Sequence, residues 1–380
     1  MSVPGFTKTV IGELENAVGG SPMNTLFTVG DINRDGRPDI VVSGRNGRMA
    51  WFENPGDGGA WQRHLVGEIE NLECGGLVYD LTGSGCPDIV DGSDYRADAL
   101  YWWENPGPGG GSWTRHVITR TGRPQFHDEL IGDLTGDGRM SLLFWNNGGR
   151  TLYWAPLPDD PRRTPWPNIH VIATGREENG HAEEGLAITD LDGDGRNEIV
   201  AGTHWYKHTG RPGEEWEGHK FASDYISTVV AVGDINGDGR KEILLSEGDA
   251  CIYGKPQGGK LAWFAPKDDL REPWEEHRIE DFLLDPHSLQ LGDLCGNGRL
   301  DILVGEIGVK DRYTENPPRL MVYENDGQGH FTRHVIDEGT GTHHARLVDL
   351  RGTGVLDIAS RPLHGPEKWN IIVWYNNRGR

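Results

Sequence analysis

The sequence predicts an all-β fold, a seven-bladed β-propeller built from four-stranded antiparallel blades. Three observations predict it: an acidic motif recurs seven times, each copy is followed by the same order of strand-like segments, and a strand missing at one end of the chain is found at the other. Such units bury their apolar faces only against neighbouring copies, so they pack into one ring. We therefore expect residues 1–380 to form a single domain, with residues 1–12 closing the last blade and blades starting near residues 21, 71, 123, 178, 225, 284 and 340.

The recurring motif is clearest in GDINRDGRPDI, TDLDGDGRNEI and GDINGDGRKEI, which start at Gly30, Thr189 and Gly233. The steps between successive leading aspartates are 49, 53, 57, 44, 59 and 56 residues. This spacing suits a four-stranded blade with loops of variable length. The leading aspartates are Asp31, Asp80, Asp133, Asp190, Asp234, Asp293 and Asp349.

Each period contains four short segments rich in β-branched and aromatic residues. An apolar segment leads into the acidic turn, and a segment such as DIVVSG or DILVGE follows it. The third segment is aromatic, as in MAWFENPG, and the fourth begins with an aromatic residue and holds a histidine, as in WQRHLV. Short runs bounded by Gly, Pro, Asn and Asp are typical of antiparallel strands.

The last copy ends at IIVWYNNRGR, before a fourth strand. The missing strand is found at the N-terminus, where FTKTVIG, from Phe6, matches FTRHVID, from Phe331, with Thr9 where His334 stands. An N-terminal strand that completes the C-terminal blade would close the ring and remove the open sheet edge that otherwise invites aggregation.

Charge and hydropathy exclude two classes of partner. A formal net charge of -22 and a pI near 5.0 argue against binding to a phosphate backbone, which needs clustered Lys and Arg. The chain has no apolar run long enough to span a bilayer. We expect a monomer without nucleic-acid or membrane partners, cytoplasmic if Met1 is native and extracellular or periplasmic if a leader was removed.

Three of the acidic turns carry a full set of oxygen ligands for a hard cation. Oxygens at positions 1, 3, 5 and 9, with Gly at position 6, suit Ca²⁺ in a stabilising role. The alternative is a turn held by side-chain to backbone hydrogen bonds without metal, and in the seventh copy Arg351 could supply its own cation. The complete sets are Asp31, Asn33, Asp35 and Asp39; Asp190, Asp192, Asp194 and Glu198; and Asp234, Asn236, Asp238 and Glu242.

Residues that repeat from blade to blade are expected to serve the scaffold. Histidines of the fourth strands and tryptophans of the third strands should pack within and between blades. The histidines are His64, His116, His170, His219, His277 and His334, and the tryptophans include Trp51, Trp102, Trp154, Trp263 and Trp374.

The face opposite the acidic turns should carry what differs between blades, because loops on a rigid scaffold are where binding and chemistry occur. The positions six residues before the leading aspartates should ring one mouth of the channel: Thr25, Cys74, His127, Glu184, Thr228, His287 and His343, with His181 and His344 close by. His127, Glu184, His287 and His343 form a candidate axial site for a transition metal or calcium; alternatively, some of these residues act as acid and base.

The ends of the second strands add blade-specific residues to the same face. Aromatic rings beside acids and histidines are typical of saccharide sites, where rings stack on sugar faces. The alternative is a polar channel mouth that simply holds water. The residues are Arg45, Asp94, Tyr95, Asn146, His204, Trp205, Tyr206, Glu247, Glu306, Arg361 and His364.

The GDxxGDGRxDI turn followed by WFENPG resembles the FG-GAP or VCBS-type repeat propellers over essentially the whole chain. Such blades occur in proteins of many functions, so the motif is informative about fold rather than activity. With HSLQLGDL and HHARLVDL at blade starts, the chain looks most like seven-bladed polysaccharide lyases such as ulvan lyases and L-rhamnose-α-1,4-D-glucuronate lyases, and like the propeller of aldos-2-ulose dehydratase.

The resemblance implies β-elimination at a uronic acid, in which one group neutralises the carboxylate, a base removes the adjacent proton and an acid protonates the departing oxygen. The candidates are Arg361 or Arg45 for the carboxylate, His127, His181 or His287 as base, and Tyr95 or Tyr206 as acid, with His343 and His344 beside them. Asp94, Asn146, His204, Trp205, Glu247, Glu306 and His364 are the candidate substrate contacts. A saccharide partner and no organic cofactor are expected. A glycoside hydrolase, a sugar dehydratase and a non-catalytic lectin or protein-binding propeller remain alternatives.

Overall fold

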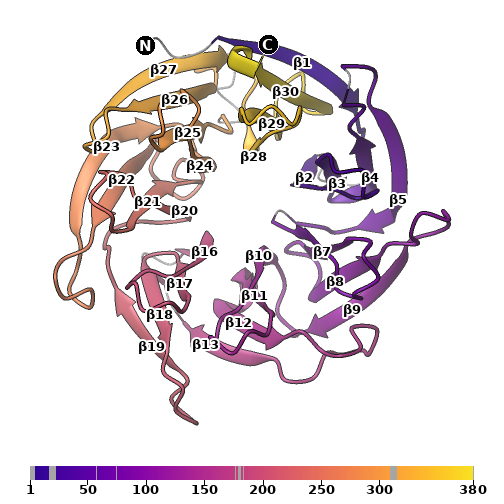
Figure 1. Ribbon diagram of the computed structural model, residues 1–380, viewed down its shortest axis with the longest axis horizontal. Coiled ribbons are helices and arrows are strands. Elements are labelled where there is room, and N and C mark those ends of the chain that lie inside the picture. The colour runs from indigo at the N-terminus through magenta and orange to yellow at the C-terminus, as the bar shows by residue number, and fades with distance from the viewer. Residues whose placement is uncertain are drawn as a thin grey trace.

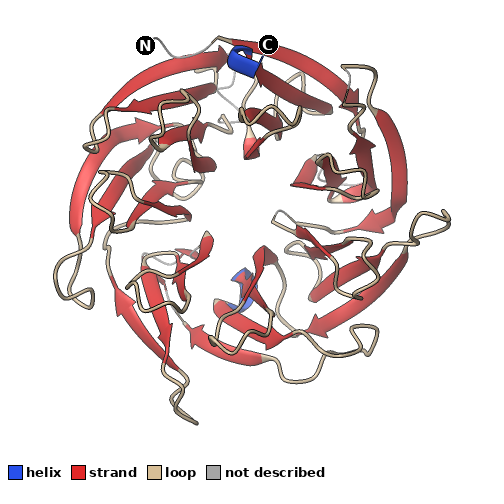
Figure 2. Ribbon diagram, in the orientation of Figure 1, coloured by secondary structure: helices blue, strands red, loops and turns tan. Residues whose placement is uncertain are grey.

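The computed structural model describes residues 5–16, 23–56, 58–73, 75–175, 177–178, 181–182, 184–308 and 315–379. Seven four-stranded antiparallel sheets stand around a central axis (Figure 1). The helices among these residues are two 3-10 turns, η1 (Asn147–Gly149) and η3 (Asn377–Gly379) (Figure 2). No helix in the described part of the chain has the length and apolar character of a membrane span. The predicted fold class is confirmed.

Each of blades 1 to 6 runs from an innermost to an outermost strand in chain order. Blades 1 to 3 contain β2 (Asn24–Gly30), β3 (Asp39–Gly44), β4 (Asn46–Glu53) and β5 (Gln62–Glu70); β6 (Leu77–Tyr79), β7 (Asp88–Gly92), β8 (Ala99–Glu104) and β9 (Thr114–Arg120); and β10 (Phe126–Gly132), β11 (Ser141–Asn146), β12 (Thr151–Pro156) and β13 (His170–Thr174). Blades 4 and 5 contain β16 (Leu186–Thr189), β17 (Glu198–Ala201), β18 (His204–His208) and β19 (Trp216–Lys220); and β20 (Thr228–Gly233), β21 (Glu242–Glu247), β22 (Gly259–Ala265) and β23 (Glu275–Leu283). Blade 6 contains β24 (Ser288–Gly292), β25 (Asp301–Gly305), β26 (Arg319–Asn325) and β27 (Phe331–Glu338). A short hairpin, β14 (Glu177–Glu178) and β15 (His181–Ala182), precedes blade 4.

Blade 7 is completed by the N-terminal strand, as the sequence predicts. It contains β28 (His343–Val348), β29 (Asp357–Arg361) and β30 (Asn370–Asn376), and β1 (Phe6–Glu13) pairs antiparallel with β30 from Phe6↔Asn376 to Glu13↔Asn370. The two ends of the chain therefore meet in one sheet (Figure 1). This pairing leaves no strand of blade 7 without its outer partner and closes the ring.

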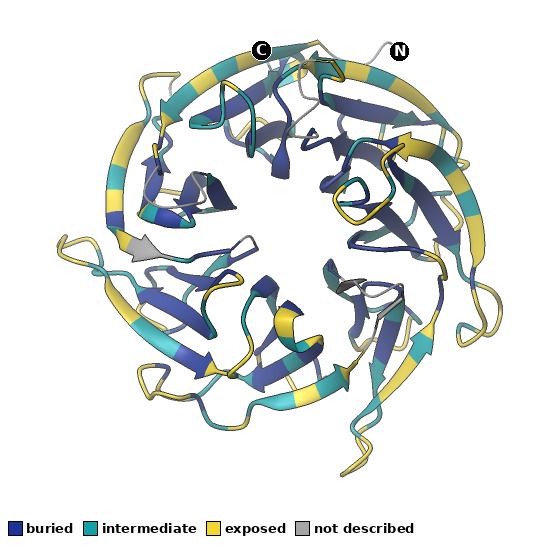
Figure 3. Ribbon diagram, turned by 180° about the vertical axis from the view of Figure 1, so that it is seen from behind, coloured by how far each residue is buried: buried dark blue, intermediate teal, exposed yellow. Residues whose placement is uncertain are grey.

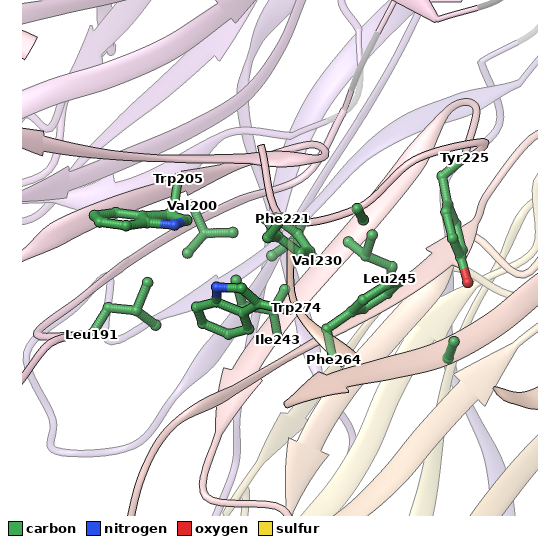
Figure 4. Packing of buried hydrophobic residues seen from close by; sticks show 12 residues of the cluster. Leu191, Val200, Trp205, Phe221, Tyr225, Val230, Ile243, Leu245, Phe264 and Trp274 are labelled. Carbon is green, nitrogen blue, oxygen red and sulfur yellow. The ribbon is translucent and has the colours of Figure 1, made fainter. Parts of the chain in front are cut away.

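The core lies between neighbouring blades. Apolar side chains of the described residues form seven clusters, and the cluster between blades 4 and 5 joins Trp205 of β18 to Phe264 of β22 through Phe221 and Trp274 (Figure 4). The second and third strands of the blades are mostly buried, whereas the outermost strands alternate between exposed and more buried residues (Figure 3). Consecutive residues of a strand point to opposite faces of the blade. Because both faces pack against neighbouring blades, the residues on both faces are apolar.

Four of the six fourth-strand histidines stack on third-strand tryptophans, which supports their scaffold role. His64 lies on Trp51 with ring centroids 4.1 Å apart and an interplanar angle of 14°. The same stack recurs as Trp102–His116, Trp154–His170 and Trp263–His277, with centroids 4.3, 5.1 and 3.9 Å apart.

The acidic turns lie at the opposite end of the first strands from the channel mouth. In blade 1, Asp31 accepts hydrogen bonds from the backbone N–H groups of Asp35 and Gly36 at 3.0 and 2.9 Å, and Asp39 accepts one from Ile32 at 2.9 Å. The carboxylates of the motif thus hold the turn by bonding its backbone. In blade 7, Arg351 donates to Asp357 at 2.6 and 3.1 Å, as the sequence suggests.

Candidate functional site

The channel mouth gathers polar side chains from the starts of several first strands. His127 lies on β10, His343 and His344 begin β28, and His287 and Glu184 lie just before β24 and β16. Thr25 and Thr228 occupy the equivalent positions in blades 1 and 5, whereas Cys74 falls outside the described residues. Positions far apart in the chain are therefore neighbours here because the seven innermost strands surround one axis.

Four imidazoles form the centre of this group, which we call the imidazole cluster (His127, His287, His343 and His344). Ring centroids are 4.3 Å apart for His287 and His343, 4.6 Å for His343 and His344, and 5.0 Å for His287 and His344. His127 lies 5.6 Å from His344 and 5.9 Å from His287 by the same measure. All four side chains are buried, with exposed fractions between 2 and 6%.

Two β-bulges present this cluster to the channel. The pairing of β10 with β11 shifts between His127 and Glu129, and that of β28 with β29 shifts between His343 and Arg346. Within the bulges, Asp128 and His344 each have a φ of 55°, a conformation that is unusual for residues other than Gly. Blades 2 and 4 place Gly75 and Gly185, also at positive φ, at the same positions of the repeat. Blades 3 and 7 accept backbone strain in order to carry a chemically active side chain there.

One buried carboxylate, that of Glu184, and two partly exposed ones, of Asp128 and Asp249, border the cluster. Glu184 Oε2 lies 3.5 Å from His287 Nε2 and 3.9 Å from His127 Nε2, and Asp249 Oδ2 lies 3.7 Å from His287 Nε2. Asp128 Oδ2 lies 3.0 Å from His127 Nδ1 and also accepts a hydrogen bond from Gly185 N–H at 2.8 Å. Asp128 therefore fixes the ring of His127 and directs its Nε2 toward the other members of the cluster.

Neutral donors hold these carboxylates in place. Asn147 donates to Glu184 Oε1 at 3.1 Å, and Ser227 lies between the two acids, 3.4 Å from Glu184 Oε2 and 3.2 Å from Asp249 Oδ2.

The environment displaces the pKa values of the imidazoles in opposite directions. Burial by itself would lower the pKa of His287, but Asp249 and Glu184 raise it to about 10. Burial and the positive charge of His287 hold the pKa values of His343 and His344 well below the usual range. The cluster therefore combines an imidazolium with neutral imidazoles at neutral pH, which is the arrangement that acid and base catalysis requires.

Two nitrogens of the cluster are buried without a hydrogen-bond partner among the described residues. They are Nδ1 of His287 and Nε2 of His344. One nitrogen each of His127, His287 and His344 lie within 4.8 Å of one another, a spacing that a single metal ion could bridge. These donors, with Asp128 on the far nitrogen of His127, fit a divalent transition ion.

Arg361 lies against the cluster, but it is not presented to the channel as the carboxylate partner that the sequence suggested. It is fully buried, donates to His343 Nδ1 at 3.0 Å and also donates to the carbonyl oxygen of Thr25. Because arginine only donates, His343 Nδ1 carries no proton and the ring is neutral.

Arg45, Asp94 and Tyr95 form a separate group where blades 1 and 2 meet. Arg45 pairs with Glu73 at 2.8 Å, and Asp94 pairs with Arg96 at 2.6 Å. The ring of Tyr95 is half exposed, with Arg45 and Arg96 both 5.3 Å from its centroid.

Several predicted substrate contacts are instead buried parts of the scaffold. Asn146 donates to the carbonyl oxygens of Arg123, Pro124 and Gln125 at 3.1 Å, and Glu306 accepts from Leu284 N–H and Arg319 N–H at 2.8 and 2.9 Å. Glu247 accepts from Ile226 N–H and Lys260 N–H at 3.1 and 3.0 Å. These polar residues stand at the ends of the second strands and form hydrogen bonds with the backbone of the adjoining loops. The sequence alone does not distinguish a polar residue that satisfies loop backbone in this way from one that binds a ligand.

Trp205 and Tyr206 also differ from the expectation of ligand contact. They are 3 and 1% exposed and pack in apolar clusters on the two faces of blade 4, because consecutive residues of a strand point to opposite faces and both faces are covered. His204 is half-buried beside Thr203 Oγ1 at 3.0 Å, and His364 is likewise half-buried. The side chain of His181 lies outside the described residues.

Sequence reasoning missed four residues near the cluster: Asp128, Asp249, Glu129 and Arg346. Asp128 carried a signal, because it stands where blades 2 and 4 have glycine. Asp249 lies in the loop after β21, and no feature of the sequence pointed to it. Glu129 is 3% exposed, and burial raises its pKa to about 8, so it is a carboxylic acid at neutral pH.

Comparison with known proteins supports the fold. A model of FG-GAP-like repeats matches residues 31–90, 190–245 and 293–360, which together include the acidic turns of all blades except blade 3. No curated protein matches this sequence.

Three solved structures illustrate the range of similar propellers. An Agrocybe aegerita lectin that recognises non-reducing terminal N-acetylglucosamine is 16% identical with a TM-score of 0.53, and the match covers 83% of this chain and 80% of the lectin. Rhamnogalacturonan lyase YesW is 14% identical with a TM-score of 0.52, covering 98 and 76% of the two chains. The V. cholerae biofilm matrix protein Bap1 is 10% identical with a TM-score of 0.55, covering 98 and 91%. Identities this low show a shared fold alone. The chain is therefore a seven-bladed β-propeller that carries FG-GAP-like repeats.

Proposed function

We propose that this protein is a carbohydrate-active lyase that performs β-elimination on a uronic-acid-containing glycan or a related sugar, at the imidazole cluster. One observation carries the proposal: neighbouring buried imidazoles have opposite protonation states, with the pKa of His287 raised to about 10 and that of His344 lowered. Environments that separate the pKa values of neighbouring groups in this way assign an acid and a base.

The reaction follows from the unpartnered nitrogens. His344 Nε2 accepts the ring proton next to the uronate carboxylate, the electron pair of that C–H bond forms the new carbon–carbon double bond, and the neighbouring C–O bond breaks. His287 is protonated, and its Nδ1–H has no partner among the described residues, so it protonates the departing oxygen. After turnover His344 carries one additional proton and His287 one fewer, and proton exchange with water restores both.

The remaining residues position these two rings. Glu184 and Asp249 hold the charge of His287 through contacts at its Nε2 of 3.5 and 3.7 Å, which leaves Nδ1 for the substrate. The bulge at His344 fixes this ring beside His287. The similarity to a rhamnogalacturonan lyase and to a sugar-recognising lectin is consistent with a saccharide ligand at this scaffold.

The test is the ultraviolet absorbance of the conjugated double bond on incubation with a panel of uronate-containing glycans. The wild-type protein and a His64→Gln control, altered only in the scaffold, should both generate the chromophore, whereas His344→Asn and His287→Gln should not. Folded wild-type protein that gives no chromophore with the whole panel would overturn the proposal. Reducing sugar without chromophore would indicate a hydrolase, turnover of a small keto-sugar a dehydratase, and glycan binding above one per chain without turnover a lectin.

A metal-dependent form of the same site is the second candidate, because His127, His287 and His344 offer three nitrogen donors within 4.8 Å. When bound, a divalent ion would supply a Lewis acid for the substrate carboxylate or carbonyl. Titration with Co²⁺ tests it: a visible absorption band that saturates at one ion per chain and is absent in His127→Asn supports a metal centre, and the lack of any band assigns the rings to acid and base work.

A further inference from the structure

Directly adjoining the imidazole cluster, the central channel contains a partly open cavity of about 300 Å³. Its wall is formed by residues of all seven innermost strands, and much of that wall is aliphatic, with Leu77, Leu130, Leu186 and Leu289 among the lining residues. His287 and His344 lie in the same wall. The volume is at the lower end of the roughly 300–1,000 Å³ of ligand pockets, which suits one small ligand or one sugar residue.

Arg346 also lines this cavity, on β28 and two residues after His344. At the same position of the repeat, the other blades have Thr28, Leu77, Leu130, Ala187, Ala231 and Gln290. Arg346 is therefore the one charged residue at that level of the ring, and no requirement of the repeat explains it.

The guanidinium of Arg346 forms no hydrogen bond and no ion pair with any described residue, in contrast to Arg45, Arg319 and Arg361. The nearest opposite charge that acts on it is Asp128. Asp128 is already engaged by His127 Nδ1 at 3.0 Å and by Gly185 N–H at 2.8 Å. A partly buried cation without an adjacent partner is costly.

Further donors line the same wall. The buried Nδ1 of His287 and Nε2 of His344 lack partners among the described residues. Gln290 uses its Oε1 to accept from Leu347 N–H at 3.1 Å, which leaves its NH₂ group as a donor toward a second partner. A guanidinium, two imidazole side chains and an amide side chain among the residues lining one small cavity match the oxygens of a planar oxyanion.

We propose that the channel cavity is an anion-binding site in which Arg346 pairs with the carboxylate of an acidic sugar, next to His287 and His344. The cavity is too small for a glycan chain, so a single uronate residue occupies it, and the sugar on its departing oxygen lies outside the cavity. The identity of the anion as a sugar carboxylate rests on the proposed function, whereas the anion site itself does not. In that arrangement Arg346, rather than Arg361 or Arg45, neutralises the carboxylate whose neighbouring proton His344 removes.

The test is thermal unfolding in a low-salt zwitterionic buffer with D-glucuronate, with its neutral analogue D-glucuronamide, or with sodium sulfate. Wild-type Tm should rise with glucuronate and not with glucuronamide, because only the acid pairs with the guanidinium. Arg346→Met should show an equal or higher Tm without ligand, since it removes an unpaired charge, and its apparent Kd for glucuronate should be at least tenfold weaker. Arg346→Lys should keep part of the response, and Arg120→Met, which alters an exposed arginine paired with Asp98, should keep all of it.

Three results separate the hypotheses. A lower Tm of Arg346→Met together with an unchanged glucuronate response makes Arg346 a structural residue and overturns the inference. A sulfate response as large as that of glucuronate, and dependent on Arg346, confirms the anion site but overturns its assignment to a sugar carboxylate. A glucuronate response without any unsaturated product from uronate glycans leaves the anion site standing while the proposed lyase activity fails.

Discussion

The imidazoles of His287 and His344 lie with their ring centroids 5.0 Å apart, and their pKa values are displaced in opposite directions. Two carboxylates act on His287, at 3.5 and 3.7 Å from its Nε2, whereas His344 is buried beside the charge that they stabilise. Two neighbouring histidines thus differ in protonation state, because the electrostatic environment rather than the residue type determines the proton affinity of each ring.

The stability of the protein should depend on pH through His287. Folding raises the pKa of His287 from about 6.5 to about 10, so its stabilising contribution is complete below pH 6.5 and is lost as the pH rises toward 10. His287→Gln should lower the free energy of unfolding by about 3 kcal/mol at pH 7, because Glu184 and Asp249 then lack their cation. Chemical denaturation at pH 7 and pH 10 measures this, and the gap to the wild type should narrow at the higher pH. The exposed control His330→Gln should show no such trend; a gap that widens with pH would contradict the assignment.

The rate of elimination should rise with pH at the acidic end through the titration of His344. Folding lowers the pKa of this ring, so the base is already free at pH 6.5, and activity should decline only below that value. His344→Asn should reduce kcat/KM by about 10²–10⁴-fold, and Asn tolerates the positive φ of this position better than most residues. Initial rates by ultraviolet absorbance from pH 4 to pH 9 provide the profile. An acidic limb that is unchanged in His344→Asn would remove this residue from the role of base.

The stacked histidines should affect stability without affecting activity. His64 lies 4.1 Å from Trp51 by ring centroids, and its Nε2 lies 2.7 Å from Glu53 Oε2. His64→Gln should cost about 1 kcal/mol of stability. A double-mutant cycle with Trp51→Leu should give a coupling of similar size. Loss of activity at unchanged Tm would show that the outer blade has a functional role.

The closing strand should be sensitive to added volume. A Cβ atom on Gly12 of β1 would lie 2.5 Å from Phe52 Cε1, across the junction of blades 7 and 1. Gly12→Ala should therefore destabilise the ring by about 1–3 kcal/mol through overpacking. Gly109→Ala is the matched control, because its Cβ would meet nothing within 4 Å. Equal Tm values for the two variants would mean that the strand moves freely at this junction.

We propose that Ca²⁺ stabilises the turn of blade 5 in preference to that of blade 4. In blade 5, Glu242 is buried with an unpartnered Oε1, and burial raises its pKa to about 7, which a cation would reverse. In blade 4, Lys207 Nζ already lies 2.7 Å from Asp194 Oδ2 and contacts Asp192. Calcium at 100 times its Kd should add about 2.7 kcal/mol of stability. Asp238→Asn should remove most of this gain and Asp194→Asn little of it in thermal unfolding with and without chelator; the reverse order would assign the ion to blade 4.

Much of the fold could be predicted from the sequence because its determinants are local and repeated. The seven acidic turns, the order of strands, the pairing of β1 with β30 and the scaffold role of His64 all follow from patterns within one period or from the comparison of two periods. A single short segment is ambiguous as a strand, but seven copies of the same pattern support one another's assignment.

The candidate site was only partly predictable. The position six residues before each leading aspartate correctly indicated where His127, Glu184, His287 and His343 lie. The same reasoning failed for Trp205 and Tyr206, since the alternation of a strand gives no exposed side when both faces of a blade are covered. It also failed for Arg361, whose partners come from blades 7 and 1.

By itself, the sequence determined the ring and the face on which the blades differ, and it predicted seven blades, because strand and turn formation depend on residues near one another in the chain. The tertiary structure alone decided which imidazole is protonated, that Asp128 and Asp249 join the cluster, and that Arg346 faces the channel without a partner. Those properties depend on distances and burial among strands from different blades, and the proton affinity of a side chain is set by these surroundings rather than by its neighbours in sequence.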